Sequence, residues 1–213
     1  MEDLNLNFAI VPICNQEGIQ ATGFIIKYDG YYFLITAGHT FESTESIASF
    51  WFIYKKDHYY LKDFLKHYRY EPILSDDMIY HDYSFFKLVV VEWDALELIP
   101  LYEYGNDSFD CFGFERDGLL RKVPRTGAKC TFPTLIAFEA GHSSKVINCG
   151  TKYGYCIRGY SGGPILIPDS TKVVGMTVIG NCDERTSDIN KRQHFIVSDF
   201  LIQQLNILSD EYE

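Results

Sequence analysis

The amino-acid sequence predicts an all-β protein, built as a barrel or a sandwich of short antiparallel strands. Many short segments are rich in Ile, Val, Phe and Tyr, and turn-forming residues separate them at close spacing. Long helical segments do not alternate with these strands, as they would in a parallel α/β sheet. The barrel and sandwich classes are therefore favoured over architectures built from βαβ units.

The strand-like segments run through most of the chain. They share a high content of β-branched and aromatic residues and cover residues 8–13, 21–28, 31–36, 47–54, 84–91, 110–114, 129–135, 145–149, 164–167, 172–179 and 193–197. The pair Asp29-Gly30 separates the second and third of these segments, and this pair is typical of a tight β-hairpin turn.

Two segments depart from the strand pattern. Residues 55–70 are aromatic and basic, and both a helix and a long hairpin fit them. Residues 198–208 predict a closing helix, because Ser198 is a good capping residue and Asp199 lies in the first turn. The apolar residues that share one face of this helix are Leu201, Leu205 and Leu208.

Length and charge limit the possible functions. The chain has 213 residues, enough for one domain or two small lobes with a shared interface, and a mild boundary lies near residues 99–106. Its 29 acidic residues outnumber 19 basic ones, which argues against a nucleic-acid partner. The apolar runs are too short for a membrane span, and residues 1–12 lack the features of a secretory signal. We therefore expect a cytoplasmic protein with no membrane partner.

The cysteines do not form a metal-binding pattern. There are six, without a CxxC pair or a Cys/His cluster at zinc-ligand spacing: Cys14, Cys111, Cys130, Cys149, Cys156 and Cys182. We expect reduced, mostly buried thiols, and neither a metal nor another cofactor.

The clearest chemical motif is Gly-Tyr-Ser-Gly-Gly-Pro at residues 159–164. A serine hydroxyl becomes a good nucleophile only when a base removes its proton and nearby donors stabilise the oxyanion. Small residues around Ser161 would allow a sharp turn that brings backbone N–H groups to a substrate carbonyl. Taken alone, the motif also fits a glycine turn before the strand at 164–167.

A histidine and an aspartate complete the set of candidate catalytic residues. His39 follows the strand at 31–36, and an imidazole titrates near neutral pH, so it can act as general base and then as general acid. Asp82 directly precedes a strand, where a buried carboxylate would fix the imidazole tautomer. Asp76 and Asp77 lie in a polar loop without such a strand and are weaker candidates.

Together these motifs resemble those of the trypsin-like (chymotrypsin-fold) serine peptidases. The order His39, Asp82, Ser161, with separations of 43 and 79 residues, is similar to that of the family. The resemblance implies two six-stranded antiparallel β-barrels with the active site in their seam, followed by a C-terminal α-helix. It places lobe 1 at about residues 7–98, lobe 2 at about 99–197 and the helix at 198–209.

The resemblance also implies the activity of a serine endopeptidase that works through an acyl-enzyme. Ser161 would attack the scissile carbonyl, His39 would transfer the proton, and Asp82 would orient His39. The backbone N–H groups of Gly159 and Ser161 would form the oxyanion hole. The implied partner is a protein or peptide substrate, such as a specific cognate protein, with a regulatory protein as a further expectation. The implied substrate-binding residues are Tyr155, Cys156, Ile157, Arg158, Val178, Ile179, Gly180 and His194.

The sequence also departs from the secreted members of this family. Tyr160 stands where digestive members carry an acid that pairs with a new N-terminus, so activation by that route is not expected. Tyr155 at the implied pocket floor is not an acid, so cleavage after Lys or Arg is not expected. Arg158 and His194 fit either a pocket for acidic or amide side chains or an exposed rim.

Two alternatives stay open at this point. Cys156 and Cys182 lie near the position of a disulfide in secreted relatives, so they are either free thiols or a disulfide. The chain is either an active peptidase or a catalytically silent module that binds peptides. The presence of His39, Asp82 and Ser161 together favours the enzyme.

Overall fold

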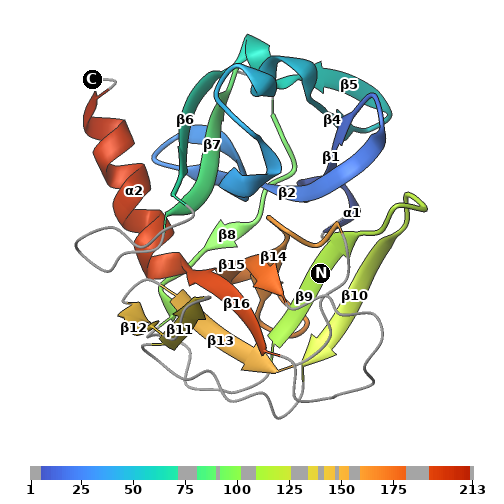
Figure 1. Cartoon of the computed structure of the whole chain (residues 1–213). Helices are drawn as coiled ribbons and strands as arrows, with labels where there is room; N and C mark the ends of the chain where they lie inside the picture. The colour runs from blue at the N-terminus through green and yellow to red at the C-terminus, as the bar shows by residue number, and fades with distance from the viewer. Residues whose placement is uncertain are drawn as a thin grey trace.

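Two large sheets form most of the structure (Figure 1). The computed structural model describes residues 6–71, 81–89, 92–101, 109–125, 134–138, 142–146, 149–153, 159–180 and 192–211. The predicted all-β class is confirmed, since the C-terminal helix is the only helix in these ranges that is longer than four residues. Within the same ranges each large sheet has seven strands, whereas the family resemblance implies six-stranded barrels.

Sheet A is built by the first part of the chain. Its strands are β1 (Ile10–Asn15), β2 (Gly18–Tyr28), β3 (Tyr31–Thr36), β4 (Trp51–Tyr54), β5 (Asp57–Tyr60), β6 (Leu65–Tyr70) and β7 (Asp82–Leu88), in the order β5-β4-β1-β2-β3-β7-β6. Asp29 and Gly30 connect β2 to β3 with φ values of 46° and 78°, as a tight hairpin turn requires. Residues 55–70 form the end of a hairpin, a 3₁₀ turn and an edge strand, so the helical alternative is wrong.

Sheet B is built by the second part. Its strands are β8 (Glu97–Leu98), β9 (Phe109–Phe114), β10 (Leu120–Arg125), β13 (Cys149–Tyr153), β14 (Pro164–Leu166), β15 (Lys172–Gly180) and β16 (Arg192–Val197). The order is β10-β9-β14-β15-β16-β13, and the short β8 pairs in parallel with β15. A separate hairpin joins β11 (Thr134–Phe138) to β12 (His142–Val146).

The helical elements are few in the described ranges. They comprise α1 (Leu6–Ala9), α2 (Ser198–Glu211) and the 3₁₀ turns η1 (Gly38–Thr40), η2 (Ser46–Ser49) and η3 (Leu61–Asp63). The helix α2 follows β16 directly and extends beside the first lobe (Figure 1). It packs through the predicted face, since Leu201, Leu205 and Leu208 are buried. The Tyr83 hydroxyl of β7 also donates to Gln204 of α2 at 2.7 Å.

The strand β2 belongs to two hydrophobic cores. Side chains alternate across a strand, and Ile25 points into the core of the first lobe while Phe24 and Ile26 point into the core shared with sheet B. All three are fully buried. Because β2 is covered on both faces, the first lobe is packed firmly against the second, and residues at this interface hold fixed relative positions.

Candidate active site

The fold brings His39 and Asp82 to one end of sheet A. Strands β3 and β7 are antiparallel neighbours with Thr36 opposite Ser84, so the turn after β3 lies beside the start of β7. His39 lies in this turn, which is η1. Gly38 is required there, because a Cβ atom would lie only 2.7 Å from the Arg69 carbonyl oxygen.

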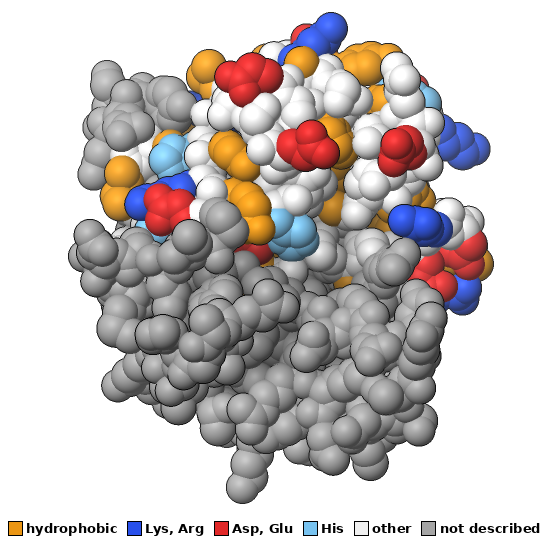
Figure 2. Space-filling view, in the orientation of Figure 1, with side chains coloured by type: hydrophobic (Ala, Val, Ile, Leu, Met, Phe, Trp, Pro, Cys, Tyr) orange, Lys and Arg blue, Asp and Glu red, His pale blue; other side chains and the backbone are white. Residues whose placement is uncertain are grey.

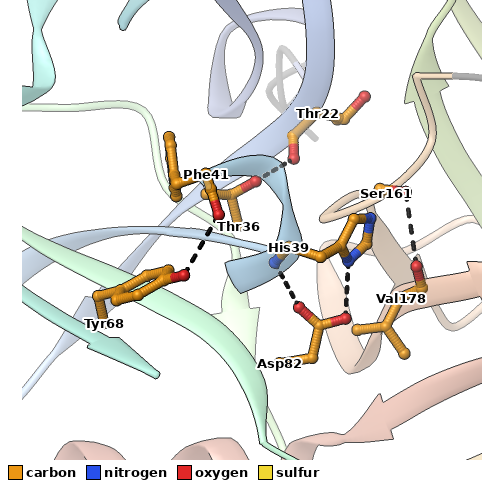
Figure 3. A network of polar contacts seen from close by, with 8 residues as sticks. All are labelled: Thr22, Thr36, His39, Phe41, Tyr68, Asp82, Ser161 and Val178. Atoms are coloured by element: carbon orange, nitrogen blue, oxygen red, sulfur yellow. Dashed lines mark hydrogen bonds and ion pairs between the residues drawn. The ribbon is translucent and has the colours of Figure 1, made fainter. Parts of the chain in front are cut away.

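The Asp82 carboxylate makes two hydrogen bonds to His39. Its Oδ1 accepts from the His39 backbone N–H and its Oδ2 from Nδ1, both at 2.7 Å (Figure 3). The Asp82 side chain is fully buried, whereas 29% of the His39 side chain is exposed. A carboxylate only accepts, so Nδ1 carries the proton and Nε2 of the neutral ring is left as an acceptor.

The pKa of His39 lies above its usual value of 6.5. Burial of the ring lowers this pKa, but the hydrogen bond that the ring donates to Asp82 and the charge of the Asp82 carboxylate raise it by more. The ring is therefore poised to accept a proton, and the Asp82 carboxylate stabilises the imidazolium that results.

Ser161 comes from the second lobe, in the turn before β14. Gly159 and Gly162, on either side of it, have φ values of 97° and 80°, which favour glycine. A Cβ atom on Gly162 would lie 2.2 Å from the Thr36 hydroxyl and 2.7 Å from the Ala37 nitrogen. The turn therefore packs directly against the segment that leads to His39.

The Ser161 hydroxyl is directed at a backbone carbonyl. It donates to the Val178 oxygen at 3.5 Å, and in Figure 3 Ser161 lies on the side of the His39 ring away from Asp82. The pairing of β15 with β16 shifts between Thr177 and Ile179, so Val178 occupies a bulge. His39 and Ser161 both belong to the described residues, and their side chains are not hydrogen-bonded to each other.

The predicted oxyanion-hole residues have available N–H groups. In the described part of the chain, neither Gly159 N–H nor Ser161 N–H donates to a protein acceptor, while the carbonyls of both residues accept hydrogen bonds. The intervening Tyr160 is buried, and its ring packs on Gly113, where a Cβ atom would lie 2.4 Å away. An aromatic side chain packed in the interior thus occupies position 160, directly before Ser161.

The predicted pocket residues fall into two groups. Tyr155, Cys156, Ile157 and Arg158 lie outside the described residues, as does Cys182. Val178 is buried in the shared core. The backbones of Ile179 and Gly180 continue β15, where Ile179 is paired with His194 of β16.

Two residues next to the candidate site were missed by the sequence analysis. Thr22 of β2 is hydrogen-bonded to the Ser161 turn, and the ring centroids of Tyr70 and His39 are 6.1 Å apart. Burial raises the pKa of Tyr70 and the Asp82 charge raises it further. A threonine or tyrosine in a strand is an ordinary strand former, so no local pattern distinguishes either residue.

The described residues show no metal site. They contain no group of three or more His, Cys, Asp or Glu side chains that could hold an ion. None of the helices in those ranges is long and apolar enough to cross a membrane. On the face drawn in Figure 2, acidic and basic side chains of the described residues are interspersed.

Comparisons with known proteins give a match at the level of structure. No protein-family model matches the sequence, and no curated protein matches it. The scabies mite inactivated protease paralogue S-D1 has a TM-score of 0.66 at 15% identity, over 98% of this chain and 95% of that one. For the active form of the Rv3671c protease from M. tuberculosis the TM-score is 0.62 at 15% identity, over 94% and 81%.

A third structure, the MamO protease domain from Magnetospirillum magneticum, has a TM-score of 0.59 at 12% identity. The match covers 93% of this chain and 96% of the MamO domain. At identities this low the likeness concerns the fold, and it extends over nearly the whole chain. The protein has the double β-barrel fold of the trypsin-like serine proteases, as the resemblance of its motifs implies.

Proposed function

We propose that the protein is a serine endopeptidase in which His39, Asp82 and Ser161 form the catalytic triad. The observation that carries this proposal is the pair of hydrogen bonds that the buried Asp82 carboxylate accepts from the backbone N–H and the ring Nδ1 of His39. It fixes the ring and its tautomer in the way a general base beside a serine requires. A buried carboxylate that only stabilised the fold would not need to hold a half-buried, titratable ring.

The reaction would proceed in two halves. The Ser161 Oγ bonds to the scissile carbonyl carbon while His39 Nε2 takes the hydroxyl proton. The C–N bond then breaks as His39 gives this proton to the leaving amine, and an ester on Ser161 is left. Water attacks the ester with His39 again as base, so the acid product leaves and the free hydroxyl is restored.

The oxyanion would be stabilised by the N–H groups of Gly159 and Ser161. Such a donor contributes about 3 kcal/mol to the transition state. Before attack, the Ser161 hydroxyl has to turn from the Val178 oxygen toward His39. In this proposal the movement is a rotation of the half-buried Ser161 side chain.

We also propose a protein or peptide as substrate, bound along β15 near Val178, Ile179 and Gly180 and beside His194. Specific recognition of a cognate protein would restrain a peptidase for which activation cleavage of the digestive type is not expected. Mass spectrometry of products from a proteome-derived peptide library would define the preference at the scissile bond. A preference for Lys or Arg would contradict the pocket prediction.

A catalytically silent peptide-binding module is the second candidate. The hydrogen bond that the Ser161 hydroxyl donates to the Val178 oxygen favours this candidate, because the hydroxyl is then not hydrogen-bonded to the His39 ring. One structural neighbour, the scabies mite S-D1 protein, is an inactivated protease paralogue, which also supports this candidate, since the fold occurs without activity. Both candidate functions predict peptide binding, but only the peptidase predicts a nucleophilic Ser161.

A fluorophosphonate probe distinguishes the two. The peptidase reacts covalently at Ser161, and the variants Ser161→Ala and His39→Ala lose the label. Ser49→Ala is the matched control, because the Ser49 side chain is exposed on η2 and bonded only to its own turn. Absence of label on the folded wild-type protein would contradict the peptidase and leave the silent module.

A further inference from the structure

Thr22 of β2 connects the two lobes at the Ser161 turn. Its N–H donates to the Ser161 carbonyl at 2.9 Å, and its hydroxyl donates to the Gly159 carbonyl at 2.6 Å. The same hydroxyl accepts from the Phe114 N–H of β9 at 2.7 Å. Thr22 is fully buried, so these bonds form away from competing water.

The carbonyl of Thr22 is tied to the strand that leads to His39. It accepts a hydrogen bond from the Thr36 hydroxyl at 2.8 Å (Figure 3). Thr36 is the last residue of β3 and is also fully buried. A continuous series of hydrogen bonds therefore runs from Thr36 through Thr22 to Ser161.

The two carbonyls held by Thr22 belong to the residues whose N–H groups are the proposed oxyanion donors. The held carbonyls belong to the two peptide planes on either side of the plane that carries the Ser161 N–H. Fixing both neighbouring planes limits the backbone rotation that would turn the Ser161 N–H away, and it limits rotation at Gly159, where glycine itself restricts the backbone very little. We propose that Thr22 is a positioning residue that sets the Ser161 hydroxyl and the oxyanion amides relative to His39. This inference rests on the proposed function.

The side chain at this position has to donate and accept at once. A hydroxyl does both from one oxygen atom, whereas the methyl group that replaces it in valine does neither. Thr22→Val keeps the shape of the side chain but leaves the Phe114 N–H and the Gly159 carbonyl without that partner in the interior. Thr22→Ser keeps the hydroxyl and loses only a methyl group.

The test measures the second-order rate constant of fluorophosphonate labelling at Ser161 for the full chain. We expect Thr22→Val to react at least tenfold more slowly than wild type, and Thr22→Ser to stay within threefold. The folded fraction of each variant is measured by circular dichroism at the assay temperature. A purely structural loss would slow labelling only in proportion to the unfolded fraction, so a tenfold change in protein that is more than nine-tenths folded reports positioning.

Tyr54→Phe is the matched control. The Tyr54 hydroxyl also donates and accepts, since it donates to Asp94 Oδ2 at 2.8 Å and accepts from the Asp94 N–H at 3.0 Å. Its partner lies in the first half of the chain and not in the Ser161 turn, so this variant should label at the wild-type rate. Comparing Tyr54→Phe with Thr22→Val shows whether slower labelling follows from losing any hydroxyl that both donates and accepts, or only from losing the one at Thr22.

Three outcomes decide against the inference. The inference is overturned if Thr22→Val is labelled at the wild-type rate. It is also overturned if folded Thr22→Ser is labelled as slowly as Thr22→Val. If Thr22→Val does not fold, Thr36→Val takes its place, with a two- to fivefold slower rate expected and an unchanged rate overturning the inference. Wild-type protein that fails to label at all contradicts the proposed function instead, and the positioning role falls with it.

Discussion

Asp82 holds His39 at two points, the backbone N–H and the ring Nδ1, with both distances at 2.7 Å. The first bond fixes the η1 turn and the second fixes the ring within it. One fully buried carboxylate therefore controls both where the imidazole lies and which nitrogen carries the proton.

Asp82→Asn should lower kcat by about 10⁴-fold. An asparagine has the same shape, but its amide NH₂ has to face either the His39 N–H or Nδ1, and the ring tautomer with a free Nε2 loses its support. The measurement is kcat for a peptide selected from the cleavage library. Asp94→Asn is the control, since this aspartate lies at the surface beside Lys55; a loss of less than tenfold in Asp82→Asn would contradict the orienting role.

The raised pKa of His39 predicts the pH dependence of activity. The base has to be neutral, so kcat/KM should rise with pH, with a midpoint above 6.5. In Asp82→Asn the carboxylate charge that raises this pKa is lost while burial still lowers it, so the midpoint of the remaining activity should move down. A wild-type midpoint below 6.5 would show that the carboxylate does not outweigh burial.

The raised pKa of His39 also makes the free energy of unfolding depend on pH. Because the folded protein binds the His39 proton more tightly than the unfolded chain, the stabilisation is complete below pH 6.5 and is lost as pH rises through the folded pKa. Urea unfolding at several pH values should show this decline in the free energy of unfolding. His39→Gln should lack this contribution to the decline; an identical pH dependence in both proteins would contradict the prediction.

Local sequence patterns predicted those parts of the fold whose causes are local. The Asp29-Gly30 turn, the extent of β3 and the buried face of α2 each depend on residues close in the chain, and the structure has all of them. The segment 47–54 is different, because its first part is the 3₁₀ turn η2 and the strand begins only at Trp51. A buried Ile47 looks the same in either element when only the sequence is known.

The rest of the candidate site depends on contacts between distant segments. The bulge at Val178 arises from the register of β15 with β16, and the contact of Thr22 with Gly159 spans 137 residues. Neither residue type predicts such a contact, so the sequence pointed to the Ser161 turn and not to Thr22, which is hydrogen-bonded to it. The short strand β8 escaped prediction for the same reason, since its pairing is with β15 alone.

The packing of α2 can be tested with two neighbouring residues. Leu205 is fully buried and Ile207 is 46% exposed. Leu205→Ala should lower the free energy of unfolding by about 2–5 kcal/mol, because it leaves a cavity between the helix and the shared core. Ile207→Ala should change it by about 0.5 kcal/mol or less. Urea unfolding measures both, and equal losses would mean that the helix is not seated on this face.

Gly162→Ala should disrupt the contact between the lobes. The new Cβ would lie 2.2 Å from the Thr36 hydroxyl and 2.3 Å from the Thr22 carbonyl, and its backbone has a φ of 80°. The turn has to move away from β2 and β3, so we expect a loss of about 3 kcal/mol or more in the free energy of unfolding. Fluorophosphonate labelling should fall with it, because Ser161 moves relative to His39.

Gly118→Ala separates backbone strain from the clash. Gly118 has nearly the same φ, 82°, but nothing lies within 4 Å of its would-be Cβ. This variant should lose about 1–2 kcal/mol from the left-handed backbone alone and label at the wild-type rate. If the two alanine variants were equally stable and equally reactive, the close approach of the Ser161 turn to Thr22 and Thr36 would have no role in the site, because strain is the only cost they share.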